Sequence, residues 1–299
     1  MLAANNKENW QNMDIYQGII LGILQGLTEF LPVSSSGHLV LGQIYFNITE
    51  FVLIFDISVH MGTLLAVLVV YFPDIKLMMV SIFGFLGNLA GRKPIGPLLK
   101  TDENLKLAVF IIIGSVPTAL IGLVLKNFEQ VLFSSDILVG CMLILTGSIL
   151  WFSRRYYCNG APVRNSEDNS AGNPDGKLDT RRAVFIGIVQ GLAVIPGISR
   201  SGSTIVAGMV AGLDRDKAAK FSFLLSVPAI LGAEILGVKD AIETGFVMNS
   251  AIVYGTIASF IVGLIALKLL LKLVHRGKFH LFAPYCWLAG VLVLLSKIF

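Results

Sequence analysis

Two long apolar regions of this chain are each interrupted near the middle by Pro, Gly and several Ser. Residues 15–46 contain the run LPVSSSGH, and residues 183–213 contain the run IPGISRSG. A helix needs about 20 consecutive apolar residues to cross a bilayer, and the parts on the two sides of each interruption are shorter than that. Because unpaired backbone groups are costly in hydrocarbon, such broken helices are stable only where protein or a wet cavity satisfies those groups. We therefore predict that each region forms a re-entrant helical hairpin.

The rest of the chain has the composition of a membrane protein. Hydrophobic residues make up 55% of the 299 residues and charged residues 14%, and the mean hydropathy is +0.78. Soluble domains carry about 25% charged residues, so this chain lacks the polar side chains to cover its own surface. Residues 74–90 are apolar with a Gly-X-X-Gly break, and we expect an interfacial or half-buried helix there. The stretches long enough to cross about 30 Å of hydrocarbon are 51–72, 106–125, 136–152, 221–238, 250–271 and 281–298.

The two interrupted regions resemble one another at an offset of 165 residues. Each region begins a half that continues with three spans, and three crossings, an odd number, leave the second half inverted. We predict an all-α polytopic membrane protein of six transmembrane helices plus two re-entrant hairpins, arranged as an inverted repeat. Within one domain, 1–299, the first repeat is 15–152, a polar cytoplasmic linker is 153–182, and the second repeat is 183–298. The matching residues are Gln25-Gly26-Leu27 with Gln190-Gly191-Leu192, and Ser34, Ser36 and Gly37 with Ser199, Ser201 and Gly202.

The basic residues favour one side of the six-span arrangement. Most of the 23 Lys and Arg lie in 72–106, in 153–220 and at the end of the fifth span, which fall on the same side. The positive-inside rule assigns that side to the cytoplasm. The first hairpin then enters from outside, the second enters from the cytoplasm, and their tips meet within the membrane. This loop asymmetry accounts for the net charge of +4 better than nucleic-acid binding does.

The first interruption carries residues suited to phosphate chemistry. Gln25 and Glu29 are four residues apart, so on a helix their side chains share one face, one turn apart. Pro32 ends that helix, and a second short helix should start in the run that follows. A helix start offers free N–H groups and a positive dipole to an anion. The run consists of Ser34, Ser35, Ser36, Gly37 and His38.

Arg200 is the most informative residue of the second interruption. At mid-depth an Arg costs at least about 2.5 kcal/mol on insertion scales, so it should face a cavity and an anionic partner. Its planar fork suits bidentate contact with phosphate. Hydroxyls at Ser199, Ser201 and Thr204 lie beside it in the sequence. One Arg, one carboxylate, one imidazole and several hydroxyls at the same depth form the inventory that phosphate-ester hydrolysis needs.

Each of these residues also has a purely structural explanation. Glu29 could be an interfacial carboxylate, His38 a packed core histidine, and Arg200 a residue reaching the interface from a hairpin end. Taken together these structural explanations are less convincing than each is alone, because they give no reason why both hairpins place polar groups beside a helix break. The ionisable residues Asp56, His60 and Glu234 also lie in apolar surroundings, and we expect structural or supporting roles, with Asp56 and Glu234 the better supporting candidates.

The two motifs closely resemble those of the bacterial undecaprenyl-diphosphatase family, the BacA type of bacitracin-resistance protein. The resemblance rests on QGLTEFLPVSSSGHL and PGISRSGSTI, is supported by FSFLLSVPAILGAE, and extends over nearly the whole chain. The family's [E/Q]-X-X-X-E element falls on Gln25 and Glu29, followed by Ser34, Ser35 and His38. Its P-G-X-S-R-S-X-X-T motif falls on 196–204. With Gln at position 25, one carboxylate rather than two remains for a metal.

The resemblance implies an activity, a cofactor and a location. The chain would remove the terminal phosphate of undecaprenyl diphosphate, giving undecaprenyl phosphate for reuse as the carrier of peptidoglycan and other cell-wall polymers, with associated bacitracin resistance. A divalent cation, Mg²⁺ or Ca²⁺, would be held by Gln25 and Glu29. The expected location is the bacterial cytoplasmic membrane, with the active site open toward the outer face. The expected partners are the polyprenyl diphosphate lipid and the bilayer, without nucleic acid; the oligomeric state stays open, a homo-oligomer included.

We predict Glu29, Ser35, His38 and Arg200 as catalytic residues. Arg200 would clamp the terminal phosphate, and Ser35 is the candidate nucleophile, with His38 as base and later as acid. Direct attack by His38, or by water that His38 activates, stays open. A transporter or lipid-phosphate flippase with the same inverted-repeat anion site is the alternative function. The predicted substrate-binding residues are Ser34, Ser36, Gly37, Ser199, Ser201 and Thr204.

Overall fold

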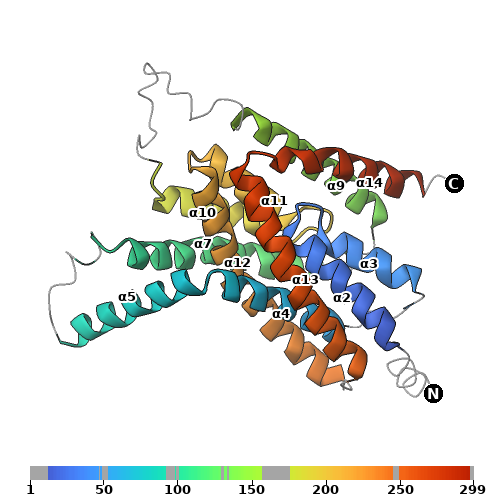
Figure 1. The fold of residues 1–299 in the computed structure, drawn as a ribbon, viewed down its shortest axis with the longest axis horizontal. Helices are drawn as coiled ribbons and strands as arrows, with labels where there is room; N and C mark the ends of the chain where they lie inside the picture. Colours follow the sequence, from blue (N-terminus) through green and yellow to red (C-terminus); the bar gives the residue numbers. More distant parts are fainter. Residues whose placement is uncertain are drawn as a thin grey trace.

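The computed structural model contains helices and no strands among the residues that it describes, which are 13–46, 48, 53–91, 98, 101–128, 131–132, 135–156, 176–244 and 249–296. Figure 1 shows the helices gathered into one body, with α5 reaching away from it. The helices of the first half are α2 (Ile15–Phe30), α3 (Ser35–Tyr45), α4 (Leu53–Val70), α5 (Phe72–Ala90), α7 (Glu103–Lys126) and α9 (Asp136–Phe152), followed by the 3-10 segment η1 (Ser153–Tyr156). Those of the second half are α10 (Thr180–Leu192), α11 (Arg200–Val210), α12 (Arg215–Thr244), α13 (Ser250–His275), η2 (Phe279–Phe282) and α14 (Ala283–Leu295).

Six of the described helices are long and apolar enough to cross a membrane, which is the predicted number. They are α4, α5, α7, α9, α12 and α13. Five of them match predicted spans. The sixth differs, because among the described residues of the predicted span 281–298 the α-helix α14 has 13 residues, whereas α5, with 19 residues, is long enough to cross. The chain is a multi-pass membrane protein.

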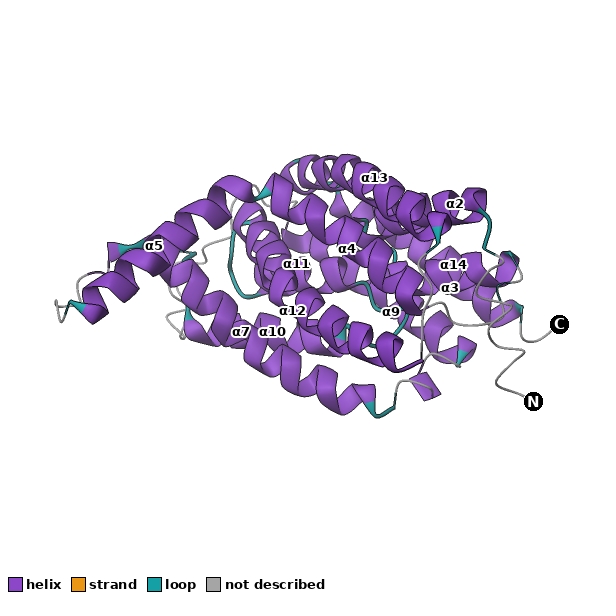
Figure 2. Cartoon of the chain, turned by 90° about the horizontal axis from the view of Figure 1, so that it is seen from below, coloured by secondary structure: helices purple, strands orange, loops and turns teal. Residues whose placement is uncertain are grey.

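Helix α5 is far less buried than the expected interfacial or half-buried helix. Among its side chains only Met78 is buried, and Figure 2 shows the helix projecting from the rest of the chain. Hydropathy alone cannot separate a helix that packs on neighbours from one that faces lipid. Because an additional crossing at α5 would change the side of every later connection, the assignment of sides from loop charge stays a prediction.

Both interrupted regions form two short helices with a break at the motif. Helices α2 and α3 have 16 and 11 residues, and α10 and α11 have 13 and 11. The two breaks lie against each other: the N–H of Gly197 donates to Ser34 Oγ at 3.2 Å, and Ser201 Oγ donates to the carbonyl of Phe30 at 2.9 Å. The two helix breaks therefore contact each other, although the bonded residues are 163 and 171 positions apart in the sequence.

The two halves exchange helix contacts in a matching way. Helix α2 of the first half packs on α13, and α10 of the second half packs on α7. Small residues permit this close approach, as in other membrane helices. A Cβ at Gly22 would come closer than 3.0 Å to the carbonyl oxygen of Gly255, and one at Gly187 would do the same at Gly114. Equivalent glycines, 165 residues apart, thus make equivalent contacts.

The predicted linker lies largely outside the described residues. Of its range 153–182, residues 157–175 are not described, whereas η1 forms its beginning and α10 starts at Thr180. Asp179 caps α10 by accepting a hydrogen bond from the N–H of Arg182 at 2.9 Å. The second half thus begins with a capped helix.

Candidate active site

Glu29 lies in the last turn of α2 and is buried, with 7% of its surface exposed. Its neighbour Phe30 packs edge to face on Phe223, with ring centroids 5.9 Å apart, which fixes the end of the helix. The carboxylate oxygen Oε2 accepts hydrogen bonds from Gln25 Nε2 at 3.0 Å and from Ser35 Oγ at 2.7 Å. The spacing of four residues between Gln25 and Glu29 therefore places both side chains together, as predicted.

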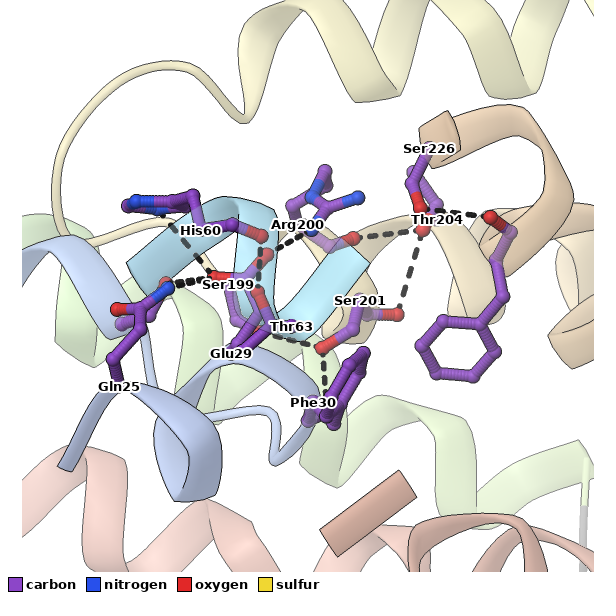
Figure 3. Close-up of polar contacts among 12 residues, drawn as sticks. Gln25, Glu29, Phe30, His60, Thr63, Ser199, Arg200, Ser201, Thr204 and Ser226 are labelled. Atoms are coloured by element: carbon purple, nitrogen blue, oxygen red, sulfur yellow. Dashed lines mark hydrogen bonds and ion pairs between the residues drawn. The ribbon is translucent and has the colours of Figure 1, made fainter. Parts of the chain in front are cut away.

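Arg200 pairs with the other oxygen of this carboxylate. It is the first residue of α11, and its guanidinium Nη2 donates to Glu29 Oε1. The Arg200 side chain keeps 22% of its surface exposed, whereas that of Glu29 keeps 4%. Figure 3 shows Gln25, His60 and Arg200 converging on Glu29. The structure thus joins the predicted guanidinium of the second half to the predicted carboxylate of the first, and each charge offsets the burial of the other.

The backbone is strained at Ser34, in the break between α2 and α3. Its φ of 68° makes it the one non-glycine residue with positive φ in the described part of the chain. Such a conformation costs about 1–3 kcal/mol and persists where surrounding contacts hold it. Here the Ser34 hydroxyl accepts from Gly197, and the Ser34 carbonyl lies 2.8 Å from His38 Nδ1. Strain held by contacts from both hairpins is typical of a functional site.

Both ring nitrogens of His38 have partners, and neither partner is Ser35. Nδ1 faces the Ser34 carbonyl at 2.8 Å, and Nε2 lies 2.6 Å from the hydroxyl of Tyr285 in α14. The predicted nucleophile and base are therefore not hydrogen-bonded to each other here. The hydroxyl of Ser35 instead donates to Glu29, because the end of α2 brings the carboxylate to the start of α3.

His60 of α4 is the imidazole nearest to the carboxylate. Its Nε2 lies 3.7 Å from Glu29 Oε2, and its Nδ1 lies 2.8 Å from the carbonyl of Asp56. Asp56 in turn accepts from Gln43 Nε2 at 2.8 Å. Of the three ionisable residues expected to have structural or supporting roles, His60 rather than Asp56 or Glu234 touches the site. The sequence indicated His60 as a candidate because it is an ionisable residue within an apolar span. No such feature of the sequence indicated Tyr285.

The three predicted hydroxyls of the second hairpin, those of Ser199, Ser201 and Thr204, make contacts within the protein. Ser199 Oγ caps α11 by accepting from the N–H of Gly202 at 3.1 Å. Ser201 Oγ donates to Phe30, and Thr204 Oγ1 donates to the carbonyl of Arg200 at 2.7 Å. All three side chains are buried. They hold the start of α11 and its arginine in place, and their predicted contact with substrate stays a prediction.

The predicted binding residues of the first hairpin differ in burial and in the contacts that they make. Ser36 is half-buried, and its hydroxyl lies 3.4 Å from Ser34 Oγ. Gly37 is buried, and a Cβ there would meet nothing closer than 3.6 Å. The N-terminal turn of α3 therefore combines Ser35, Ser36 and Gly37 with the unpaired N–H groups of a helix start, which suits an anion.

Gln25 has an oxygen without a partner. Its Oε1 is buried and accepts no hydrogen bond in the described part of the chain, although its Nε2 is bonded to Glu29. The described residues contain no group of three or more His, Cys, Asp or Glu that could hold a metal ion. Mg²⁺, however, often binds through one or two carboxylates, waters and substrate phosphates. The oxygens of Gln25 and Glu29 therefore fit a cation shared between protein and substrate.

The sequence matches one protein family over most of its length. The model of the family described as bacitracin resistance protein BacA matches residues 18–292, which include both hairpins. A relative from Desulforapulum autotrophicum, named undecaprenyl-diphosphatase, is 51% identical over 95% of this chain and 99% of its own. Two more with this name come from Desulfosudis oleivorans, 50% identical over 93% and 97% of the two chains, and Methanobrevibacter smithii, 40% identical over 96% and 99%.

Proposed function

Because the chain belongs to the family of the bacitracin resistance protein BacA, we propose that it hydrolyses undecaprenyl diphosphate to undecaprenyl phosphate and inorganic phosphate. The observation that carries the proposal is the Glu29 carboxylate in contact with both the Ser35 hydroxyl and the Arg200 guanidinium. A hydroxyl beside a base and a cation is what phosphoryl transfer to a side chain requires. The reaction recycles the lipid carrier of cell-wall polymers, and bacitracin resistance fits the family name.

The proposed scaffold is an inverted repeat in which two re-entrant hairpins meet inside the membrane. Equivalent hydrogen bonds support it. Thr146 Oγ1 of α9 donates to the carbonyl of Gly197 at 3.0 Å, and Cys286 Sγ of α14 donates to that of Pro32 at 3.2 Å. Gly197 and Pro32 are separated by the same 165 residues as the two motifs. The last helix of each half, 15–152 and 183–298, thus holds the hairpin break of the other.

Arg200 binds the terminal phosphate in this mechanism. Its Nη2 contacts Glu29, and the rest of its guanidinium has no other hydrogen-bond partner among the described residues. Its remaining N–H groups can therefore form the parallel pair of bonds that a phosphate accepts. The N-terminal turn of α3 adds donors from the opposite hairpin. The phosphorus is thereby held beside Ser35, with the lipid phosphate as leaving group.

Ser35 then attacks the terminal phosphorus, and Glu29 accepts its proton. The Oγ–P bond forms while the bond from phosphorus to the bridging oxygen breaks, releasing undecaprenyl phosphate. The 2.7 Å contact of Ser35 Oγ with Glu29 Oε2 favours Glu29 over His38 as this base. Water next attacks the phosphoserine. His38 takes the proton of that water, and Glu29 returns its proton to Ser35 Oγ as inorganic phosphate leaves.

The same site is proposed to hold Mg²⁺ or Ca²⁺ through Gln25 and Glu29. The unpartnered Oε1 of Gln25 supports this assignment, since a buried amide oxygen without a donor is costly. When bound, a divalent cation would offset the charge of the diphosphate oxygens. The proposed location is the bacterial cytoplasmic membrane. The site would open to the outer face in the six-span arrangement predicted from the sequence, in which α5 does not cross and the basic loops are cytoplasmic.

The decisive experiment measures phosphate release from a C55 diphosphate by the purified protein in detergent, with Mg²⁺, with Ca²⁺ and with a chelator. Arg200→Lys should keep the fold and lose at least about a hundredfold in kcat, because the bidentate contact is lost. Arg181→Lys, at an exposed position in α10, is the matched control and should retain activity. Absence of release by wild type, combined with movement of labelled lipid phosphate across vesicles, would favour the flippase alternative.

A further inference from the structure

Helix α14 reaches the break of the first hairpin with two consecutive side chains. Cys286 is buried and donates to the Pro32 carbonyl, while Tyr285 contacts His38. The Tyr285 and His38 rings are stacked, with centroids 5.7 Å apart and an interplanar angle of 18°. These contacts join residues that are 247 and 254 positions apart in the sequence. Helix α14 therefore contacts both the break before Ser35 and the histidine that follows it.

Hydrogen-bond chemistry assigns the tautomer of His38. The Ser34 carbonyl can only accept, so the Nδ1 that faces it at 2.8 Å must carry a proton. In the neutral ring Nε2 is then the acceptor, and the Tyr285 hydroxyl at 2.6 Å donates to it. The two partners together fix the orientation of the ring and make Nε2 the nitrogen that carries the lone pair.

The contact between Tyr285 and His38 has no counterpart at the equivalent positions of the other half. The residue equivalent to Cys286 is Thr146, since their acceptors Pro32 and Gly197 are related by the 165-residue offset. The neighbour of Thr146 is Leu145, a residue that cannot donate a hydrogen bond from its side chain.

The residue at the position equivalent to His38 is Ser203. Its hydroxyl has no hydrogen-bond partner in the part of the chain that the structure describes. The contacts that hold the fold thus occur in both halves, whereas the Tyr285 and His38 contact occurs only beside Ser35 and Glu29. This asymmetry connects Tyr285 with the chemistry rather than with the scaffold.

We propose that Tyr285 is a positioning residue of the phosphatase, which holds His38 in its Nδ1–H tautomer until the attacking water replaces the Tyr285 hydroxyl as the donor to Nε2. This inference rests on the proposed function. Tyr285 acts through His38 and not on the phosphate, so its loss should slow turnover without weakening substrate binding by Arg200.

The first test is Tyr285→Phe, which keeps the ring and removes the hydroxyl. We expect kcat to fall about tenfold to a hundredfold, as for other residues that orient a reactive side chain, with KM nearly unchanged. The control is Tyr254→Phe in α13, because Tyr254 and Tyr285 are exposed to similar extents, 49% and 47%. The control should keep wild-type kcat. Wild-type kcat in Tyr285→Phe would overturn the proposal.

The second test asks whether Tyr285 acts through His38. Tyr285→Phe is introduced into His38→Ala and should cause no further loss, because the group that it orients is absent. A loss as large as that in the wild-type background would mean that Tyr285 acts independently of His38, and would overturn the proposal.

The third test does not depend on activity. Diethyl pyrocarbonate modifies unprotonated imidazole nitrogen, and mass spectrometry gives the rate at each histidine. In wild type the Tyr285 hydroxyl covers Nε2, so His38 should react several-fold faster in Tyr285→Phe, with His275 and His280 as unchanged internal references. Equal rates at His38 would overturn the contact. A wild-type protein that releases no phosphate would instead overturn the proposed function and leave this measurement valid.

Discussion

Adding one methyl group at Gly22 should separate the helix that carries Glu29 from its neighbour. A Cβ at this position would lie closer than 3.0 Å to the carbonyl oxygen of Gly255 in α13, whereas ordinary contacts begin at 3.4 Å. The opposing atom belongs to the backbone and cannot rotate away, so the helices must move apart by several tenths of an ångström or more. Overpacking of this kind costs about 1–3 kcal/mol, and a backbone obstacle favours the upper end.

The expected change in the free energy of unfolding is the difference between two opposed contributions. Replacing Gly by Ala within a helix gains about 1 kcal/mol in helix propensity, which offsets part of an overpacking cost of about 3 kcal/mol. Gly22→Ala should therefore lower the free energy of unfolding by about 2 kcal/mol. Gly187→Ala should do the same, because its Cβ would meet the Gly114 carbonyl in the same way. Gly122→Ala in α7 is the control, since a Cβ there meets nothing within 4 Å.

The assay is thermal unfolding in detergent together with phosphate release. Gly22→Ala and Gly187→Ala should unfold at lower temperatures than wild type and lose activity, because α2 carries Glu29 and α10 leads into the break before Arg200. Gly122→Ala should be as stable as wild type or more so. If Gly22→Ala were as stable as Gly122→Ala, the close approach of α2 and α13 would be wrong. Unequal effects at Gly22 and Gly187 would contradict their equivalence in the proposed repeat.

Three further predictions concern the site and a helix cap. Ser34→Gly should be about 1 kcal/mol more stable than Ser34→Ala in thermal unfolding, because both lose the hydroxyl but only Gly accepts the positive φ of 68° without strain; equal stabilities would contradict the strain. Chelation should abolish phosphate release, and Gln25→Leu should raise the Mg²⁺ concentration needed for half-maximal rate; an unchanged requirement would remove Gln25 from the cation site. Asp102 caps α7, and the N–H of Leu105 that donates to it lowers the pKa of its carboxyl below the ordinary value of 3.8. Its contribution to stability should therefore be complete above pH 3.8 and disappear as the pH falls through the lower folded value, so the stability difference between wild type and Asp102→Ala should shrink below pH 3.8 in denaturation measured as a function of pH.

The contact between Glu29 and Arg200 could be anticipated because of the cost of burial. A charge placed in an apolar segment needs an opposite charge, and the two interrupted regions each supplied one. The helix breaks were equally predictable from Pro, Gly and Ser at the motifs. Such arguments depend on residue types and local spacing, which the sequence contains.

The position of His60 and Tyr285 could not be anticipated in the same way. Whether His60 faces the site depends on the rotation of α4 about its axis, and the contact of Tyr285 depends on how α14 docks across the break. Hydropathy is nearly uniform around such helices, so it does not indicate which face meets protein. The same limit explains α5, whose apolar side chains resemble those of a packed span although only Met78 is buried.

In the proposed inverted repeat, one position of the hairpin serves two different functions. Ser35 and Arg200 are related by the 165-residue offset, and each is the first residue of the second helix of its hairpin. Two arginines at these facing positions would repel each other, and two serines would leave the phosphate without a guanidinium to bind it. The carboxylate is likewise present in one half only, because the position equivalent to Glu29 holds Val194. In this proposal a symmetric scaffold brings two equivalent helix starts to one anion, and the difference between their side chains yields one reactive site in which the proposed nucleophile and the proposed phosphate clamp face each other.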